Sequence, residues 1–216
     1  MIWLSTHWPW TLDTKGSKTT IPGDAKVIQV DYSNDESIKR ALTGMEVVIS
    51  TISGEALDVQ GKIAAAAKEV DVKLFVPSEF GGTTEGATEG LFGAKANVQT
   101  QLKDLGIPYA VFYTGPFADY IWSWYVIRAL WPFHPINPTV KRFLDLDVMS
   151  GKVSVGGDGN RQISFTSRTD IARYVSYVLT HLPREQLKNR TFTISGENKV
   201  RSNLWDSRYD WVVVSD

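Results

Sequence analysis

The segment EVVIST, at residues 46–51, decides the fold class, because nearly every residue in it is apolar or β-branched. Strands of this composition are typical of parallel sheets that are covered on both faces. Two further segments have the same character, KLFVP at residues 73–77 and YAVFY at residues 109–113. Helical patterns at residues 57–70 and 92–105 separate the three segments. The sequence therefore predicts βαβ units and a parallel α/β sheet.

The same alternation extends toward the amino terminus. VIQV at residues 27–30 is the predicted first strand, and residues 35–42 form a predicted helix that Gly44 closes. Right-handed crossovers place the strands of such a series in one sheet. A nucleotide-binding sheet of the Rossmann type begins with a strand, a G-x-G-x-x-G-like turn and a helix, and residues 1–24 contain no such pattern. The predicted fold class is α/β, a Rossmann-like parallel sheet that is N-terminally incomplete, with a small C-terminal lobe.

The alternation stops after residue 114, and shorter elements follow. Segments 152–155 and 162–166 are predicted strands, joined as a hairpin by the glycine-rich turn at residues 156–160. Thr169 is the predicted cap of a helix at residues 170–182. A last short strand is expected at 191–194.

Aromatic residues gather in three regions without clear periodicity. Between Trp122 and Phe133 they predict an irregular lobe, in which the rings either line a pocket for a lipophilic molecule or pack as core. The termini, residues 1–18 and 200–216, hold five of the eight tryptophans and are predicted to be irregular.

Composition excludes several classes of protein. The chain has 216 residues, a net charge of -1 and scattered lysines and arginines, so no basic stripe for nucleic acid is present. It has no cysteine and only three scattered histidines, which leaves no thiol chemistry and no zinc-ligand spacing. The first residues lack the features of a secretory signal, and no stretch reaches membrane-spanning length. We expect a cytoplasmic protein with a small-molecule partner, no metal and no membrane contact.

Three short sequence motifs in the middle of the chain are specific enough to indicate a protein family. They are VVISTISG at residues 47–54, KLFVPSEFG at 73–81 and GIPY at 106–109, with Gln60 between the first two. Together they resemble the NmrA-like and isoflavone-reductase-like family of atypical short-chain dehydrogenases/reductases. The resemblance covers residues 19–199.

The resemblance implies an oxidoreductase that uses NADP (NADPH) and transfers a hydride to a small unsaturated or carbonyl substrate. Without the glycine-rich turn we expect cofactor binding to be impaired, because that turn provides the backbone donors that hold the pyrophosphate. Two alternatives stay open. In the first alternative, the chain is an NAD(P)-sensing regulatory protein with a protein partner and no turnover. In the second, it is an inactive truncated gene product.

Candidate site residues lie at the carboxyl ends of the predicted strands, where open α/β sheets bind ligands. By strand position and by the resemblance, the cofactor-binding candidates are Lys95 together with Ser50, Thr51, Ile52, Ser53, Pro77, Ser78, Glu79, Phe80, Gly81, Thr114, Gly115, Pro116 and Phe117. The last four are included because the resemblance implies that their turn lies beside the nicotinamide and the substrate.

Lys95 is the catalytic candidate. Spacing alone favours a solvated helix lysine, whereas the resemblance implies a group that assists proton transfer beside the nicotinamide. No lysine follows a tyrosine at the Tyr-x-x-x-Lys spacing of commoner dehydrogenases. Glu79 is predicted to have a structural role, accepting backbone N–H groups within its loop.

These assignments predict four regions. Residues 1–18 are atypical, 19–115 form the incomplete NAD(P)-binding core, 116–199 form a substrate lobe with returning strands and a helix, and 200–216 are an atypical tail.

Overall fold

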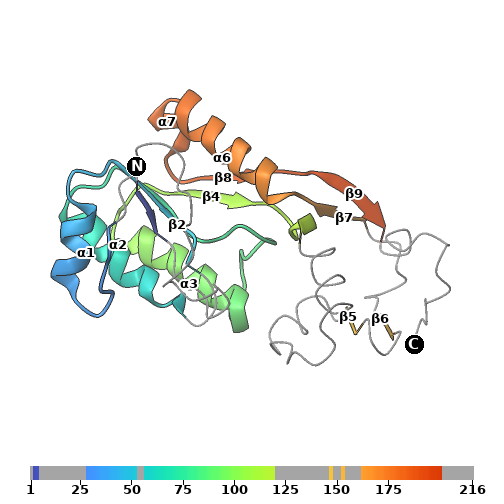
Figure 1. Ribbon diagram of the computed structural model, residues 1–216, viewed down its shortest axis with the longest axis horizontal. Coiled ribbons are helices and arrows are strands. Elements are labelled where there is room, and N and C mark those ends of the chain that lie inside the picture. Colours follow the sequence, from blue (N-terminus) through green and yellow to red (C-terminus); the bar gives the residue numbers. More distant parts are fainter. Residues whose placement is uncertain are drawn as a thin grey trace, which may run out of the picture. The chain divides into compact units, whose positions relative to one another are not determined.

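The computed structural model describes residues 2–4, 28–52, 56–119, 146–147, 152–153 and 162–200 (Figure 1). Two compact units divide the chain. The first comprises Met1–Tyr113 and Leu179–Phe192, and the second comprises Thr114–Val178 and Thr193–Asp216.

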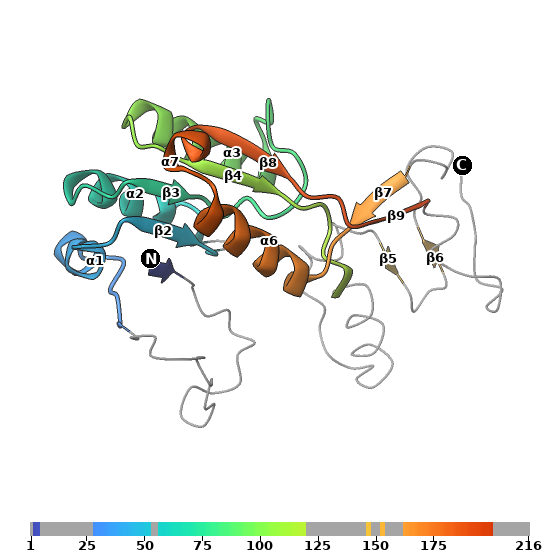
Figure 2. The same ribbon diagram turned by 90° about the horizontal axis from the view of Figure 1, so that it is seen from above.

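The first unit is built on a parallel sheet. Strands β1 (Ile2–Leu4), β2 (Val47–Ser50) and β3 (Leu74–Val76) pair in that order, each parallel to the next. Parallel bridges join β3 and the loop after it to the segment of β4 (Ala110–Tyr113), and β4 pairs with β8 (Arg190–Thr193). The strand order is therefore β1-β2-β3-β4-β8, which Figure 2 shows from above. The predicted Rossmann-like parallel sheet is confirmed.

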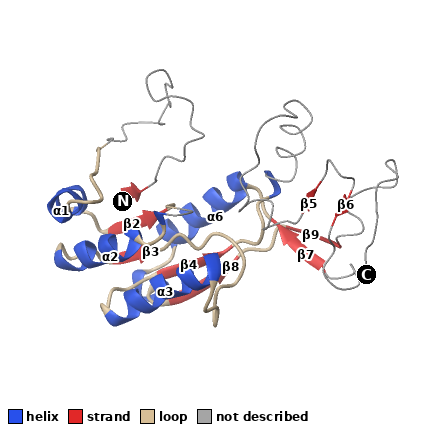
Figure 3. Ribbon diagram, turned by 90° about the horizontal axis from the view of Figure 1, so that it is seen from below, coloured by secondary structure: helices blue, strands red, loops and turns tan. Residues whose placement is uncertain are grey.

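Three helices pack in sequence along this sheet. They are α1 (Asp35–Leu42), α2 (Val59–Glu69) and α3 (Gly90–Asp104), with α2 in contact with both of the others (Figure 3). The core between helices and sheet is apolar, and its fully buried members include Leu42, Ile63, Phe75, Leu102 and Val111. These helices and strands β2 to β4 lie where the sequence predicts them.

Local signals explain where two of these helices begin and end. The Asn34 side chain accepts the N–H groups of Glu36 and Ser37 at 3.0 and 3.3 Å, which caps α1. Gly106, at φ +64°, follows the last residues of α3 in the left-handed conformation that glycine adopts without strain. The chain then turns directly into the segment that leads to β4.

The first strand of the sheet differs from the prediction. Residues 28–30 form no strand, and Ile28 is 41% exposed. A strand needs a neighbour for its backbone groups, and the neighbour of β2 opposite β3 is Ile2–Leu4, with Trp3 in register with Ile49. Val30 and Tyr32 instead pack against the core as irregular chain. The prediction of a strand at residues 27–30 is therefore wrong for the residues described.

The second unit contains short antiparallel pairs. Strand β5 (Leu146–Asp147) pairs with β6 (Lys152–Val153), and β7 (Gln162–Phe165) pairs with β9 (Glu197–Val200). In the described residues the two strands of the predicted hairpin are each paired elsewhere, β6 with β5 and β7 with β9, and the turn at residues 156–160 lies outside the described residues. The pairing of β7 with β9 joins distant parts of the sequence, so no local pattern predicts it.

Helix α6 (Arg168–His181) begins two residues earlier than predicted, and α7 (Arg184–Leu187) is a single turn. The Asp170 N–H donates to the Ser167 hydroxyl at 3.1 Å, so Ser167 is the cap rather than Thr169. The aromatic cluster from Trp122 to Phe133 lies outside the described residues. Among the helices that are described, none is long and apolar enough to cross a membrane.

Candidate functional site

The loop at residues 77–81 leaves the carboxyl end of β3 and is held from two sides. The Ser78 N–H donates to Oε1 of Gln60, a buried residue of α2, at 2.9 Å. Further along, Gly81 forms a parallel bridge with Tyr113 at the end of β4, and the Phe80 ring stacks on Phe112 with centroids 6.4 Å apart. These contacts fix the backbone of the loop between α2 and β4.

Lys95 contacts this loop from α3. Its ammonium donates to the backbone oxygen of Glu79 at 2.5 Å. Burial lowers the pKa of Lys95 below its ordinary value, and the nearby Glu79 charge opposes that shift by favouring the ammonium form. A Cβ placed on Gly81 would lie 3.2 Å from the Glu79 oxygen and 3.8 Å from Nζ, so the Gly81 backbone lies close to both groups. The side chain therefore lies against the loop rather than extending into solvent.

Glu79 lies at the centre of a buried polar cluster, which we call the Glu79 cluster: Glu79, Thr84, Gln99 and Tyr113. Only 1% of Glu79 is exposed. Its Oε2 accepts the Thr84 hydroxyl at 3.0 Å and its Oε1 accepts the Gln99 amide at 2.8 Å. The Gln99 nitrogen also lies 2.9 Å from Thr84 Oγ1 and 3.2 Å from the Tyr113 hydroxyl, so its two hydrogens face three acceptors.

The contacts of Glu79 agree with the predicted structural role of this residue, but its hydrogen-bond donors differ from those expected. The Glu79 carboxyl accepts side-chain donors from Thr84 and Gln99, whereas backbone donors of its own loop were expected. The donors come from α3 and from farther along the loop that precedes it, so the carboxyl links separate parts of the first unit. A buried carboxyl group is stable in such a position only when its oxygens are hydrogen-bonded.

The predicted residues after β2 are described in part. Ser50 ends β2 at the same edge as the 77–81 loop, is fully buried, and its hydroxyl has no hydrogen-bond partner in the part of the chain that the structure describes. Thr51 is half-buried, and Ile52 is part of the apolar core. Ser53 lies outside the described residues.

The turn at Thr114, Gly115, Pro116 and Phe117 belongs to the second unit. Gly115 has φ +66°, and a Cβ there would lie 2.3 Å from the Ser164 oxygen, so this close approach requires glycine. Pro116 accepts the Thr166 N–H at 3.2 Å, and Phe117 forms a parallel bridge with the same residue. The structure thus joins this turn to the end of β7 and joins Lys95 to residues 79–81.

Sequence reasoning missed Gln99, Thr84 and Tyr113. One signal was available for Gln99, since it follows Lys95 by four residues and such pairs share a helix face. Thr84 gives no signal, because a lone threonine in a glycine-rich loop is ordinary. Tyr113 reads as one more aromatic residue in an apolar strand.

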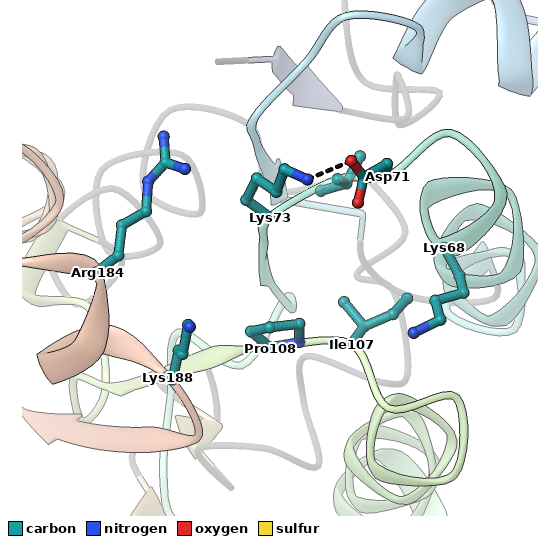
Figure 4. Close-up of a pocket in the computed structure, with 8 residues that line it drawn as sticks. Lys68, Asp71, Lys73, Ile107, Pro108, Arg184 and Lys188 are labelled. Atoms are coloured by element: carbon teal, nitrogen blue, oxygen red, sulfur yellow. Dashed lines mark hydrogen bonds and ion pairs between the residues drawn. The ribbon is translucent and has the colours of Figure 1, made fainter.

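A pocket of about 220 Å³ lies at the opposite, amino-terminal edge of the sheet, beside the residues that precede β3 and β4 (Figure 4). It is lined by Lys68, Asp71, Val72, Lys73, Ile107, Pro108, Arg184 and Lys188. None of the predicted site residues lines it. In the described residues no group of histidine, aspartate and glutamate side chains could hold a metal ion.

A parallel sheet with helical crossovers and a polar site at its carboxyl edge defines an α/β protein of the Rossmann type. The sequence profile of the NmrA-like family matches residues 13–199. The chain therefore belongs to the NmrA-like family, and the predicted resemblance is confirmed.

Relatives and solved structures agree with this assignment. The chain is 30% identical over 193 residues to isoflavone reductase homolog P3 of Arabidopsis thaliana, covering 84% of this chain and 57% of that protein. It is 31% identical over 150 residues to isoflavone reductase homolog A622 of Nicotiana tabacum, covering 67% and 44%. The structure of AtPrR2 with NADP+ and (+)pinoresinol is similar with a TM-score of 0.55 and 27% identity, covering 76% of this chain and 51% of that one. The chain thus spans about half the length of these relatives.

Proposed function

We propose that this chain is an NADP-dependent reductase that acts on a small unsaturated or carbonyl substrate, with Lys95 as its proton-transfer group. The observation that carries the proposal is the position of Nζ, part-buried, 2.5 Å from the Glu79 backbone oxygen and close to the Gly81 backbone. Membership of the NmrA-like family and the NADP+ and pinoresinol bound to AtPrR2 support it.

The residues at the carboxyl edge fit the nicotinamide end of the cofactor. Lys95 lies against the loop at this edge, and Ser50 provides a buried hydroxyl that lacks a partner among the described residues. Bound NADPH would supply the hydride. The sequence has no glycine-rich turn before a helix to hold the pyrophosphate, so we propose that affinity for NADPH is weak. Titration calorimetry tests this, and micromolar binding would contradict it.

Lys95 would complete the reduction by moving a proton. When a carbonyl carbon gains a hydride, its oxygen gains negative charge and needs a proton. The Lys95 ammonium can donate that proton and become a neutral amine, which then recovers a proton from water. The lowered pKa of Lys95 suits this exchange, because proton transfer is most efficient when the pKa of the group approaches the working pH.

The test replaces Lys95 with methionine, which keeps an unbranched, slightly shorter side chain and removes the ammonium. Lys95→Met should lower kcat by roughly 10²–10⁴-fold, the usual contribution of a positioned acid or base, with little change in NADPH affinity. Lys103→Met is the matched control, because Lys103 is an exposed lysine of the same helix. Unchanged turnover in Lys95→Met would return Lys95 to the class of ordinary helix lysines. NADPH binding without any turnover in the unaltered chain would favour the regulatory function instead.

A further inference from the structure

Two residues of α3 contact the same residue of the 77–81 loop. Lys95 donates to the backbone oxygen of Glu79 at 2.5 Å, and Gln99, four residues later, donates to its Oε1 at 2.8 Å. Residues four apart on a helix lie on one face, about one turn from each other. The helix is therefore joined to Glu79 at two successive turns, once through the backbone and once through the side chain.

We propose that Gln99 is a positioning residue for Lys95, which acts by locking α3 to Glu79 so that Nζ stays against the loop beside Gly81. The inference rests on the proposed role of Lys95 in proton transfer. Gln99 itself is one turn away and is not assigned any contact with substrate or cofactor.

One hydrogen bond is not enough to hold Lys95 in place. A lysine side chain has a flexible four-carbon stem, and fixing it costs up to about 2 kcal/mol of side-chain entropy. The hydrogen bond from Lys95 must offset this entropy alone unless the backbone of α3 and the backbone of the loop are already fixed relative to each other. The Gln99–Glu79 bond provides that fixation, since it joins the helix that bears Lys95 to the residue whose oxygen receives the ammonium.

The Glu79 cluster makes the Gln99 contact rigid. Glu79 and Thr84 are fully buried, so water does not replace a lost partner easily. Thr84 also contacts the Tyr113 hydroxyl at 3.2 Å, which adds β4 to the same set of bonds. Loss of the Gln99 amide would leave a buried oxygen of Glu79 without its donor, and the loop would shift to satisfy it.

The charged surroundings of Lys95 are simple in the described part of the chain. Glu79 of the loop is the group whose charge acts on Lys95, and Tyr113 of β4 is the other titratable residue in the Glu79 cluster. Gln99 is neutral, so its replacement by a neutral residue of similar length changes the geometry around Lys95 without changing the charge.

The experiment compares Gln99→Met with Gln101→Met. Methionine has nearly the length of glutamine and removes the amide. Gln101 lies on the same helix but faces α2, where its Oε1 would be 2.4 Å from a Cβ placed on Gly61. Gln99→Asn is a milder second variant, which keeps an amide but withdraws it from Glu79 by one methylene group.

Two readouts are used, and the first needs neither substrate nor cofactor. Nitrogen-15 spectra of the lysine ammonium groups, with Lys95 assigned through Lys95→Met, report how fast its protons exchange with water. We expect exchange at Lys95 to become at least about tenfold faster in Gln99→Met, to accelerate less in Gln99→Asn and to stay unchanged in Gln101→Met. The second readout is turnover, where Gln99→Met should lower kcat about tenfold with KM for NADPH unchanged.

The outcomes separate this inference from the proposed function. Unchanged Lys95 exchange in both Gln99 variants, with kcat still lost in Lys95→Met, would overturn the role of Gln99 and leave the reductase proposal intact. Faster exchange in Gln99→Met, with no effect of Lys95→Met on turnover, would support the positioning of Lys95 by Gln99 and overturn its role in catalysis. Equal effects of Gln99→Met and Gln101→Met would overturn the inference, because any disturbance of α3 would then suffice.

Discussion

The two edges of the first unit's sheet differ in how far their polar side chains are buried. At the carboxyl edge the polar groups of the Glu79 cluster are withdrawn from water and bonded to one another. At the amino edge the pocket of Figure 4 is lined by charged side chains that pair with their neighbours in solvent, as Lys73 does with Asp71 and Arg184 with Glu46. Removing the partner of a buried polar group lowers the stability of the fold strongly, whereas an exposed ion pair contributes little to stability. The carboxyl edge is therefore where geometry is held tightly enough to position a reactive group.

The largest expected effect on stability comes from removing the centre of the Glu79 cluster. Glu79→Leu should lower the free energy of unfolding by about 3 kcal/mol, because the buried Thr84 and the half-buried Gln99 lose their acceptor and Lys95 loses its nearby negative charge. Urea unfolding followed by circular dichroism measures it. Glu85→Leu, an exposed glutamate in the same loop, should change stability by less than about 0.5 kcal/mol. Equal effects at Glu79 and Glu85 would remove the contrast between buried and exposed groups.

A smaller effect should depend on pH. Burial places the pKa of Lys95 in the folded chain below its ordinary value of 10.5, so between these two values the unfolded chain binds more protons than the folded chain. The free energy of unfolding then rises with pH across this window, by at most about 1.4 kcal/mol per pH unit. Lys95→Met lacks this contribution, so the original chain should gain stability relative to the variant as pH rises toward 10.5.

Urea unfolding of both proteins across that pH range measures the difference, in which the titrations of all other groups cancel. A relative gain for Lys95→Met as the pH rises would mean that Glu79 outweighs burial and raises the pKa of Lys95.

The smallest expected effect is at the amino edge. Arg184 and Glu46 form an ion pair of 2.5 Å, but their side chains are 48% and 66% exposed. A double-mutant cycle with Arg184→Met and Glu46→Gln should give a coupling of less than about 1 kcal/mol, which weakens further in high salt. A coupling as large as the loss in Glu79→Leu would contradict the distinction between the two edges.

The sequence predicts well those features that depend on local pattern. Strand β2 and helices α2 and α3 follow from apolar runs and helical spacing, and the loop at residues 77–81 follows from a specific string. The expectation fails where pairing is long-range. Strand β1 is only three residues long and lies in a tryptophan-rich terminus, and β7 pairs with β9 rather than with the preceding strand.

The candidate site follows the same rule. The resemblance selects Lys95 and the loop that it contacts, because both lie in or near a recognisable string. It does not select Thr84 or Tyr113, since their importance comes from meeting Gln99 in space and not from residue type or spacing. A polar cluster assembled from a loop, a helix and a strand has no period in the sequence.

Strand β8 has a consequence for how the chain is made. The neighbour of β4 on the side away from β3 is contributed by residues far downstream: the Asn189 N–H donates to the Tyr109 oxygen at 2.7 Å, and the Phe192 ring stacks on Phe112 with centroids 5.1 Å apart. A ribosome adds about 5–20 residues each second, so the roughly 80 residues between these partners take roughly 4–16 s to emerge. During that interval β4 has an open edge that another nascent chain can pair with. Production of the folded protein should therefore depend on chaperones that cover this edge until β8 arrives.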